Sequence, residues 1–420
     1  MRVTIRKRDI YGSVEAPPSK SMTHRHLITA GLAEGGSVLE RPLVCDDTAA
    51  TVSGLKTLGI NIKEEGGRWL VEGGQITVPS SVINCNQSGT TLRLLLGTCS
   101  LLDEWCEVTG APQLLRRPNA PLLEALEQLG VQTWSEGGYP PIKIKGKMKG
   151  GVAEIRGDVS SQFISSILLA APYAVEPVTV KVTSRLESKP YVQMTLDAMR
   201  KSGVKAISKH GGIEIKVPLG RYRPTRTRIE GDWSSASFML AAGALSGKVH
   251  VDNLGIESSQ ADKEIIQALN LMGAQVKVKG NRVTTEKSIL NGIEMDLRDC
   301  PDIFPVISSL CATAQGKSTL TGLGRLKLKE SDRVEAMAEG LRRMGARVQV
   351  VNDTCIIQGG PLKGASIDPH GDHRIAMSFA VLGTVAEGET IINDPDCISK
   401  SYPGFWVDLA SLGAETRRTD

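Results

Sequence analysis

The chain has 420 residues, of which 40% are hydrophobic and 4% aromatic, and 50 Lys and Arg stand against 46 Asp and Glu. A formal charge of +4, the lack of a block of like charges and the scarcity of aromatic residues argue against a dedicated nucleic-acid-binding or membrane-surface protein. The length predicts two or three domains with ample apolar content for their cores.

The N-terminal residues 1–10 carry several basic side chains and no apolar run, so a signal peptide is not expected. No stretch of the sequence is long enough in apolar residues to span a bilayer. The eight cysteines form no Cys-x-x-Cys pair, and several stand in apolar runs. This usage predicts free, buried thiols and a cytoplasmic protein.

In chain order, the first informative stretch is residues 17–27, where two prolines precede a polar start and an apolar stripe. Ser19 can cap a helix that begins here. The first turns of this helix carry Lys20 and Arg25, and each cation opposes the helix dipole by about 0.3 to 1 kcal/mol. A bound phosphate or carboxylate would reverse that penalty, although a surface helix with solvated cations is an equally simple interpretation.

Five further polar helix starts follow along the chain, and each leads into an almost wholly apolar run. Helices of this kind must be buried. Their starts lie at Gln87, Ser160, Asp232, Pro301 and Asp372.

A second pattern, Leu or Met followed four residues later by Gly, repeats through the whole chain with a period of about 70 residues. It predicts a second helix in each repeat, ended by a left-handed glycine. After the first five glycines the sequence alternates as two strands joined by a turn. The glycines are Gly59, Gly130, Gly203, Gly273, Gly345 and Gly413.

Six repeats predict two domains of three repeats each, because three repeats of about 210 residues already reach the upper end of ordinary domain size. The basic, proline-punctuated residues 218–225 are typical of a linker. We therefore expect one domain over 16–228 and a second over 1–15 and 229–420, with strand-like residues 3–5 pairing in the second. The polar helix starts of both domains would face an active site in the cleft between them.

Charged residues gather ahead of several helices, most densely at 329–333, where Lys329 and Arg333 are spaced to share one helix face. Each cluster alone could be a solvated surface. Together they supply cations at equivalent helix-start positions of successive repeats, which suits substrates with several phosphate or carboxylate groups. No metal-ligand or nucleotide-loop motif is present, so no metal and no cofactor is expected. The cations are Lys20, Arg25, Arg117, Lys329, Arg333, Arg374 and Lys400.

These motifs, in this order, resemble the 3-phosphoshikimate 1-carboxyvinyltransferase family, also called 5-enolpyruvylshikimate-3-phosphate (EPSP) synthases. The resemblance spans nearly the whole chain. The motifs that carry it are Ser19-Lys20-Ser21 with Arg25, Ser88-Gly89-Thr90-Thr91 with Arg93, Arg117-Pro118, Ser160-Ser161-Gln162-Phe163, Ser188-Lys189-Pro190-Tyr191, Lys329-Glu330-Ser331-Asp332-Arg333, Asp372-His373-Arg374 and Lys400.

The resemblance implies an α/β fold of two inside-out domains, each of three repeated βαβαββ units around buried helices. It also implies a transferase of the shikimate pathway, in aromatic amino acid biosynthesis. Such an enzyme moves the enolpyruvyl group of phosphoenolpyruvate to the 5-hydroxyl of shikimate 3-phosphate, releases phosphate and needs no cofactor. Its partners would be these two small molecules, without nucleic acid or membrane, and a monomer is expected.

Site residues follow from the resemblance by position. The residues implied at shikimate 3-phosphate are Lys20, Ser21, Arg25, Ser160, Ser161, Gln162, Ser188, Tyr191, Asp302 and Lys329. Those implied at phosphoenolpyruvate are Lys20, Gly89, Arg117, Gln162, Arg333, Arg374 and Lys400. Addition followed by elimination needs a base and an acid. Asp302 is the candidate base and Glu330 the candidate acid, with Lys20 as a third catalytic group.

Three positions depart from the family pattern, since Gln87, His24 and Arg325 stand where asparagine is common. Two alternatives remain open. A sister enolpyruvyl transferase acting on UDP-N-acetylglucosamine carries a cysteine shortly before its Arg-Pro, and residues 110–116 contain none. An RNA-processing protein built from related repeats is disfavoured by the few aromatics and the lack of a basic stripe.

Overall fold

The computed structural model describes residues 1–419 and divides the chain into two compact units. One unit is Pro18–Ile229, and the other combines Met1–Pro17 with Glu230–Asp420.

The described residues 1–419 form six four-stranded sheets of one design, in which the first two strands are parallel and the third is antiparallel to the strand on each side of it. In Pro18–Ile229 the sheets, in spatial order, are β14 (Arg226–Arg228), β3 (Gly35–Glu40), β5 (Arg68–Gly73) and β4 (Asn61–Glu65); β6 (Ile83–Asn84), β7 (Cys106–Thr109), β9 (Tyr139–Lys145) and β8 (Gln132–Glu136); and β10 (Gly151–Ile155), β11 (Val178–Val182), β13 (Glu214–Val217) and β12 (Ile207–Lys209).

The sheets of the other unit follow the same order. They are β2 (Ile10–Glu15), β15 (Gly247–Asp252), β17 (Arg282–Glu286) and β16 (Gln275–Lys279); β18 (Glu294–Asp296), β19 (Lys317–Thr321), β21 (Thr354–Gln358) and β20 (Arg347–Val351); and β22 (Ser366–Ile367), β23 (Glu389–Asn393), β1 (Arg2–Arg6) and β24 (Glu415–Thr419). As expected from residues 3–5, β1 pairs with both β23 and β24.

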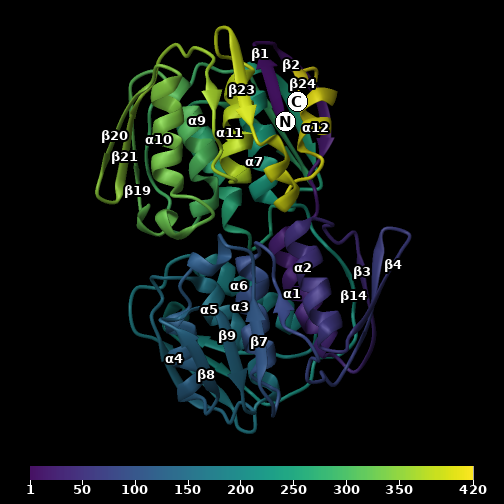
Figure 1. The fold of residues 1–420 in the computed structure, drawn as a ribbon. Helices are drawn as coiled ribbons and strands as arrows, with labels where there is room; N and C mark the ends of the chain where they lie inside the picture. Colours follow the sequence, from purple (N-terminus) through teal and green to yellow (C-terminus); the bar gives the residue numbers. More distant parts are fainter. Residues whose placement is uncertain (420) are drawn as a thin grey trace. The chain divides into compact units, whose positions relative to one another are not determined.

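Each repeat contributes one helix that is buried almost throughout: α1 (Lys20–Leu32), α3 (Gly89–Cys99), α5 (Ser161–Ala170), α7 (Trp233–Ser246), α9 (Phe304–Thr313) and α11 (His373–Gly383). The second helices are α2 (Asp46–Thr57), α4 (Ala120–Gln128), α6 (Lys189–Lys201), α8 (Ile265–Leu271), α10 (Arg333–Arg343) and α12 (Phe405–Ser411). Within their unit, α7, α9 and α11 pack against one another (Figure 1). The sheets cover the buried helices, which explains why those helices can be apolar on every side.

Short 3₁₀ helices complete the described chain. They are η1 (Leu114–Arg116), η2 (Ala171–Tyr173), η3 (His210–Gly212), η4 (Ala261–Glu264), η5 (Pro301–Ile303), η6 (Gly324–Leu328) and η7 (Pro395–Lys400).

The buried helices begin as the sequence predicts, with one exception. Side chains of Ser19, Ser88, Ser160, Asp232 and Asp372 accept hydrogen bonds from backbone amides of the helices that follow them. The start expected at Pro301-Asp302 instead forms η5, and the helix α9 that follows has no side-chain cap. The Asp302 carboxylate is therefore available for other partners, which are described below.

The six repeating glycines all adopt the left-handed conformation that the sequence predicts, with φ between 82° and 99°. Each follows the end of a second helix and lets the chain reverse into the next strand. The same turn therefore recurs once in each repeat.

All eight cysteines are free thiols, and Cys397 alone among them is not fully buried. In the described part of the chain, no helix has the length and apolar character needed to cross a membrane.

Candidate functional site

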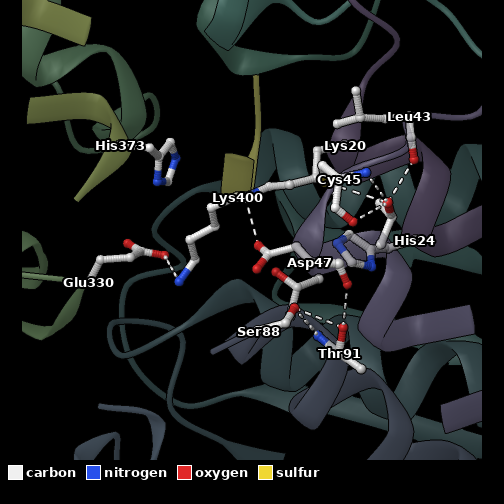
Figure 2. A network of polar contacts seen from close by, with 12 residues as sticks. Lys20, His24, Leu43, Cys45, Asp47, Ser88, Thr91, Glu330, His373 and Lys400 are labelled. Atoms are coloured by element: carbon white, nitrogen blue, oxygen red, sulfur yellow. Dashed lines mark hydrogen bonds and ion pairs between the residues drawn. The ribbon is translucent and has the colours of Figure 1, made fainter. Parts of the chain in front are cut away.

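In the unit Pro18–Ile229, the start of α1 carries Lys20 as its first residue. Its Nζ donates to Oδ2 of Asp47 on α2 at 2.9 Å, and the Asp47 side chain is only 4% exposed (Figure 2). The cation that opposes the dipole of α1 is therefore balanced by a carboxylate of the neighbouring helix. Asp47 was not among the residues implied by the resemblance, and its one signal in the sequence is the acidic pair that opens α2.

One turn deeper, His24 extends the contact between α1 and α2. Its Nδ1 lies 2.7 Å from Oγ1 of Thr51, which lies 2.7 Å from Oγ1 of Thr91 on α3. Thr91 Oγ1 also lies 3.0 Å from the backbone oxygen of Asp47 and 2.8 Å from Oγ of Ser88, the cap of α3. A buried chain of polar groups thus joins the starts of α1, α2 and α3 (Figure 2).

Arg25 lies in the second turn of α1 and is 2% exposed. Its guanidinium donates to Thr195 Oγ1 at 2.8 Å, to the Tyr191 backbone oxygen at 3.0 Å and to the Ser21 backbone oxygen at 2.9 Å. Burial lowers the pKa of Arg25 to about 10. This arginine therefore fixes α1 against α6 and brings Ser21 and Tyr191 together.

Gly89 is the first residue of α3 and lies against the side chain of Arg117, which directly follows η1. A Cβ atom on Gly89 would lie 3.3 Å from Cζ of that guanidinium. The close approach explains the glycine, because any side chain would displace the cation. Gly89 and Arg117, two of the four residues of this unit implied at phosphoenolpyruvate, are therefore neighbours.

Ser160 and Gln162 meet at the start of α5 through Arg93. Arg93 Nη1 donates to Gln162 Oε1 at 2.7 Å and to Ser160 Oγ at 3.3 Å, while Gln162 Nε2 donates to Thr90 Oγ1 at 2.8 Å. The Arg93 guanidinium also lies 5.0 Å from the centre of the Phe163 ring. Arg93 belongs to a motif of the resemblance but was not predicted as a site residue.

The remaining predicted residues of this unit lie at helix starts. Ser161 begins α5 and is buried. Ser188 precedes α6 with a left-handed φ of 53°, which is uncommon for a residue with a side chain and often marks a functional position.

In the other unit, three cations converge on the carboxylate of Asp302. Arg333 Nη1 donates to Oδ1 at 2.8 Å, Lys329 Nζ lies 3.4 Å from the same oxygen, and Arg374 Nη2 donates to Oδ2 at 3.0 Å. Burial alone would raise the pKa of Asp302, but the charges of Arg374, Lys329 and Arg333 together lower it well below its usual value. Asp302 is therefore ionised.

Arg333 is the centre of this cluster and is 1% exposed. Besides Asp302, it donates through Nε to Asp372 Oδ2 and through Nη2 to Glu330 Oε2, both at 2.8 Å. Lys400 Nζ lies 3.8 Å from the second oxygen of Glu330 (Figure 2). Burial would lower the pKa of Arg333, but the three carboxylates raise it, so the guanidinium is permanently charged. Asp372 was quoted in a motif yet not predicted as a site residue.

Two expectations about the cations are wrong in detail. Lys329 and Arg333 do not share a helix face, because α10 begins only at Arg333 and Lys329 is the extended residue after η6. They meet at Asp302 nevertheless. The cations also do not all occupy equivalent helix starts, since Arg25 lies within α1 and Lys400 ends η7.

Burial lowers the pKa of Lys329 to about 8, with Asp302 opposing that shift and Arg333 adding to it. An anionic ligand would favour the charged form of this lysine. Among residues 1–419, no group of three or more His, Cys, Asp or Glu side chains is arranged to hold a metal ion.

A repeated α/β fold whose cations gather around buried carboxylates defines an enzyme-like protein built to bind multiply anionic ligands. A sequence profile of the family described as EPSP synthase (3-phosphoshikimate 1-carboxyvinyltransferase) matches residues 5–409. The chain belongs to the EPSP synthase family.

Individual relatives agree with this assignment over their full length. The 3-phosphoshikimate 1-carboxyvinyltransferase of Methanocorpusculum labreanum is 42% identical and aligns with 99% of this chain and 100% of its own. That of Methanocaldococcus jannaschii is 40% identical over 98% of both chains. A solved structure of EPSP synthase from Acinetobacter baumannii is 27% identical, covers 100% of both chains and superposes with a TM-score of 0.84. The fold class predicted from the sequence is confirmed.

Proposed function

We propose that this chain is a 3-phosphoshikimate 1-carboxyvinyltransferase, which transfers the enolpyruvyl group of phosphoenolpyruvate to the 5-hydroxyl of shikimate 3-phosphate and releases phosphate. The observation that carries the proposal is the convergence of Lys329, Arg333 and Arg374 on Asp302 in a chain that matches its family over nearly its whole length. Both substrates are polyanions, and a buried cation cluster binds such groups strongly.

Substrate contacts divide between the units. Shikimate 3-phosphate is bound by Ser21, Arg25, Ser160, Ser161, Ser188 and Tyr191 of one unit and by Asp302 and Lys329 of the other. Phosphoenolpyruvate is bound by Gly89 and Arg117 of the first unit and by Arg333, Arg374 and Lys400 of the second, while Lys20 and Gln162 contact both substrates. Turnover therefore requires residues of both units at the same pair of substrates.

The proposed reaction is an addition followed by an elimination. In the addition, the 5-hydroxyl oxygen bonds to C2 of phosphoenolpyruvate, its proton passes to a base, and C3 gains a proton from an acid. In the elimination, the bond from C2 to the phosphate oxygen breaks, C3 loses a proton, and the enol ether forms.

Asp302 is the base and Glu330 the acid in this proposal. Asp302 is ionised and can accept a proton, and its basicity rises when substrate oxygens compete with it for Lys329 and Arg374. Glu330 is held on one oxygen by Arg333 and approached on the other by Lys400, and in this proposal these two cations also bind phosphoenolpyruvate. Lys20 stabilises the negative charge of the tetrahedral intermediate.

We further propose that the protein acts as a cytoplasmic monomer, with domains over 16–228 and over 1–15 with 229–420. The free thiols support a reducing compartment. Sedimentation of the purified enzyme tests the oligomeric state.

The decisive experiment measures phosphate release from phosphoenolpyruvate with shikimate 3-phosphate, with UDP-N-acetylglucosamine and with neither acceptor. Release that depends on shikimate 3-phosphate supports the proposal. Release that depends on the UDP-sugar, or none with either acceptor, would overturn it.

A further inference from the structure

Two parallel contacts join α1 to α2 beneath the proposed substrate site. Lys20 and His24 are one turn apart on α1, and Asp47 and Thr51 are one turn apart on α2. The first contact is the ion pair Lys20–Asp47, and the second is the hydrogen bond between His24 and Thr51. Thr91 of α3 closes the arrangement by contacting both Thr51 and Asp47.

The direction of the hydrogen bonds between His24, Thr51 and Thr91 follows from the one hydroxyl proton of Thr91. Thr91 donates to the Asp47 backbone oxygen at 3.0 Å or to Ser88 Oγ at 2.8 Å, and either bond uses its single hydroxyl proton. Thr51 must then donate to Thr91, and His24 must donate to Thr51 through Nδ1. Ser88 Oγ is an acceptor for Thr91 twice, from the hydroxyl at 2.8 Å and from the backbone amide, which it caps at 3.2 Å.

The environment of the imidazole agrees with this assignment. His24 is 0% exposed, and its Nε2 has no hydrogen-bond partner within residues 1–419. A bare ring nitrogen in a buried site is tolerated better than a buried N–H without an acceptor. Burial lowers the pKa of His24 to about 3; Asp47 opposes this shift, and Lys20 and Arg25 reinforce it.

We propose that His24, as a neutral imidazole protonated on Nδ1, is a positioning residue that holds the Lys20–Asp47 pair and the cap of α3 in place for catalysis. It acts through Thr51 and Thr91 and touches no substrate. Its loss leaves the ion pair as the remaining polar contact of this set between α1 and α2, and Lys20 then samples positions away from the reacting atoms. This role rests on the proposed function.

The kinetic test compares His24→Leu, which removes the donor, with His24→Asn, whose side-chain amide can still donate to Thr51. The leucine variant should lose about 10- to 100-fold in kcat, the size expected when a catalytic group is misplaced by about 1 Å. Its dissociation constant for shikimate 3-phosphate should change less than kcat, because only Lys20 among the proposed contacts is displaced, while Ser160, Ser188 and Tyr191 lie on other elements. The asparagine variant should recover most of the lost turnover.

His26→Leu is the matched control. His26 lies on the same helix, is 3% exposed, and has a pKa that burial lowers to about 3, yet it contributes no side-chain hydrogen bond to this chain of groups. It should lower the melting temperature without lowering the kcat of folded enzyme. Equal kcat losses in the two leucine variants, or full kcat in His24→Leu, would overturn the proposal.

¹⁵N NMR spectroscopy of the imidazole rings in the unmodified enzyme determines the tautomer of His24 without an activity assay. A protonated Nδ1 and a bare Nε2 on His24 at neutral pH support the hydrogen-bond direction, and the opposite tautomer overturns it. An enzyme inactive toward both substrates yet with the expected tautomer would overturn the proposed function and not the hydrogen-bond chain.

Discussion

A Cβ atom on Gly89 would lie 2.6 Å from Nη1 of Arg117. The obstructing atom is the end of a flexible side chain, so Gly89→Ala should fold while pushing the guanidinium aside. We expect the phosphoenolpyruvate Michaelis constant to rise about 10-fold. This change corresponds to a loss within the roughly 1 to 3 kcal/mol that one methyl group contributes in a tight pocket. Shikimate 3-phosphate affinity should barely change. Titration of both ligands checks this, and equal losses for both would mean that the start of α3 itself is distorted.

Lys20→Ala should reduce transition-state stabilisation by about 2 to 4 kcal/mol, because water cannot replace a preorganised cation at equal strength. From the sequence alone, its removal should relieve a conflict with the dipole of α1. The structure changes this expectation, since the buried Asp47 carboxylate would lose its ion-pair partner, and stability should fall by about 1 to 3 kcal/mol. Steady-state kinetics and urea unfolding measure the two effects. The control is Lys56→Ala, at an exposed position on α2. Near-normal turnover of Lys20→Ala would refute the assignment of Lys20 as a catalytic group.

Glu330→Gln tests the proposed acid. The amide keeps the shape of the side chain but cannot supply the proton, so kcat should fall by roughly 10²- to 10⁴-fold with a modest change in substrate binding. Glu335→Gln, at an exposed position in the first turn of α10, provides the control. Unchanged turnover in Glu330→Gln would remove this residue from the mechanism.

Lys329 makes substrate binding depend on pH. Its pKa in the folded protein is about 8, below the usual 10.5, so the lysine loses its charge as the pH rises through 8. Affinity for shikimate 3-phosphate should then weaken by up to about tenfold per pH unit above 8, since binding takes up one proton. Calorimetric titration between pH 7 and about 10 checks the slope. Lys329→Arg should flatten it, because arginine stays charged throughout this range.

The lowered pKa of Lys329 has the opposite effect on folding, because it makes the folded protein more stable as the pH rises. Between pH 8 and 10.5 the unfolded chain carries a proton on Lys329 that the folded chain has lost, so this group makes the free energy of unfolding rise with pH. The free energy of unfolding could instead fall over this pH range. If Lys329→Met abolished that fall, the low pKa of Lys329 would be contradicted.

Periodic features of the fold could be predicted from the sequence because each rests on local chemistry. The glycines that end the second helices need a left-handed φ, and Ser19, Ser88 and Ser160 can each satisfy an amide that a helix start leaves open. The residue types at these positions therefore predict the helix starts and helix ends directly.

Partners across elements could not be predicted in this way. Asp47 reaches Lys20 from another helix, and Asp302 turns from an expected cap into the acceptor for three cations. Local sequence does not encode which distant side chains a fold brings within hydrogen-bond distance. The cations of the site were therefore found from their motifs, as were Asp302 and Glu330, whereas the carboxylates of Asp47 and Asp372 were missed.

Strand β1 lies between β23 and β24, so the sheet that ends the chain is built around the residues that begin it. During synthesis at about 5 to 20 residues per second, β1 must wait roughly 20 to 80 s for β24 to emerge from the ribosome. The unit Pro18–Ile229 contains every strand of its three sheets and can fold during that wait. Val3 and Ile5, 1% and 0% exposed in the finished fold, remain without their core until translation ends. A truncation of the first seventeen residues should therefore unfold the half of the protein that is made last and spare the half that is made first.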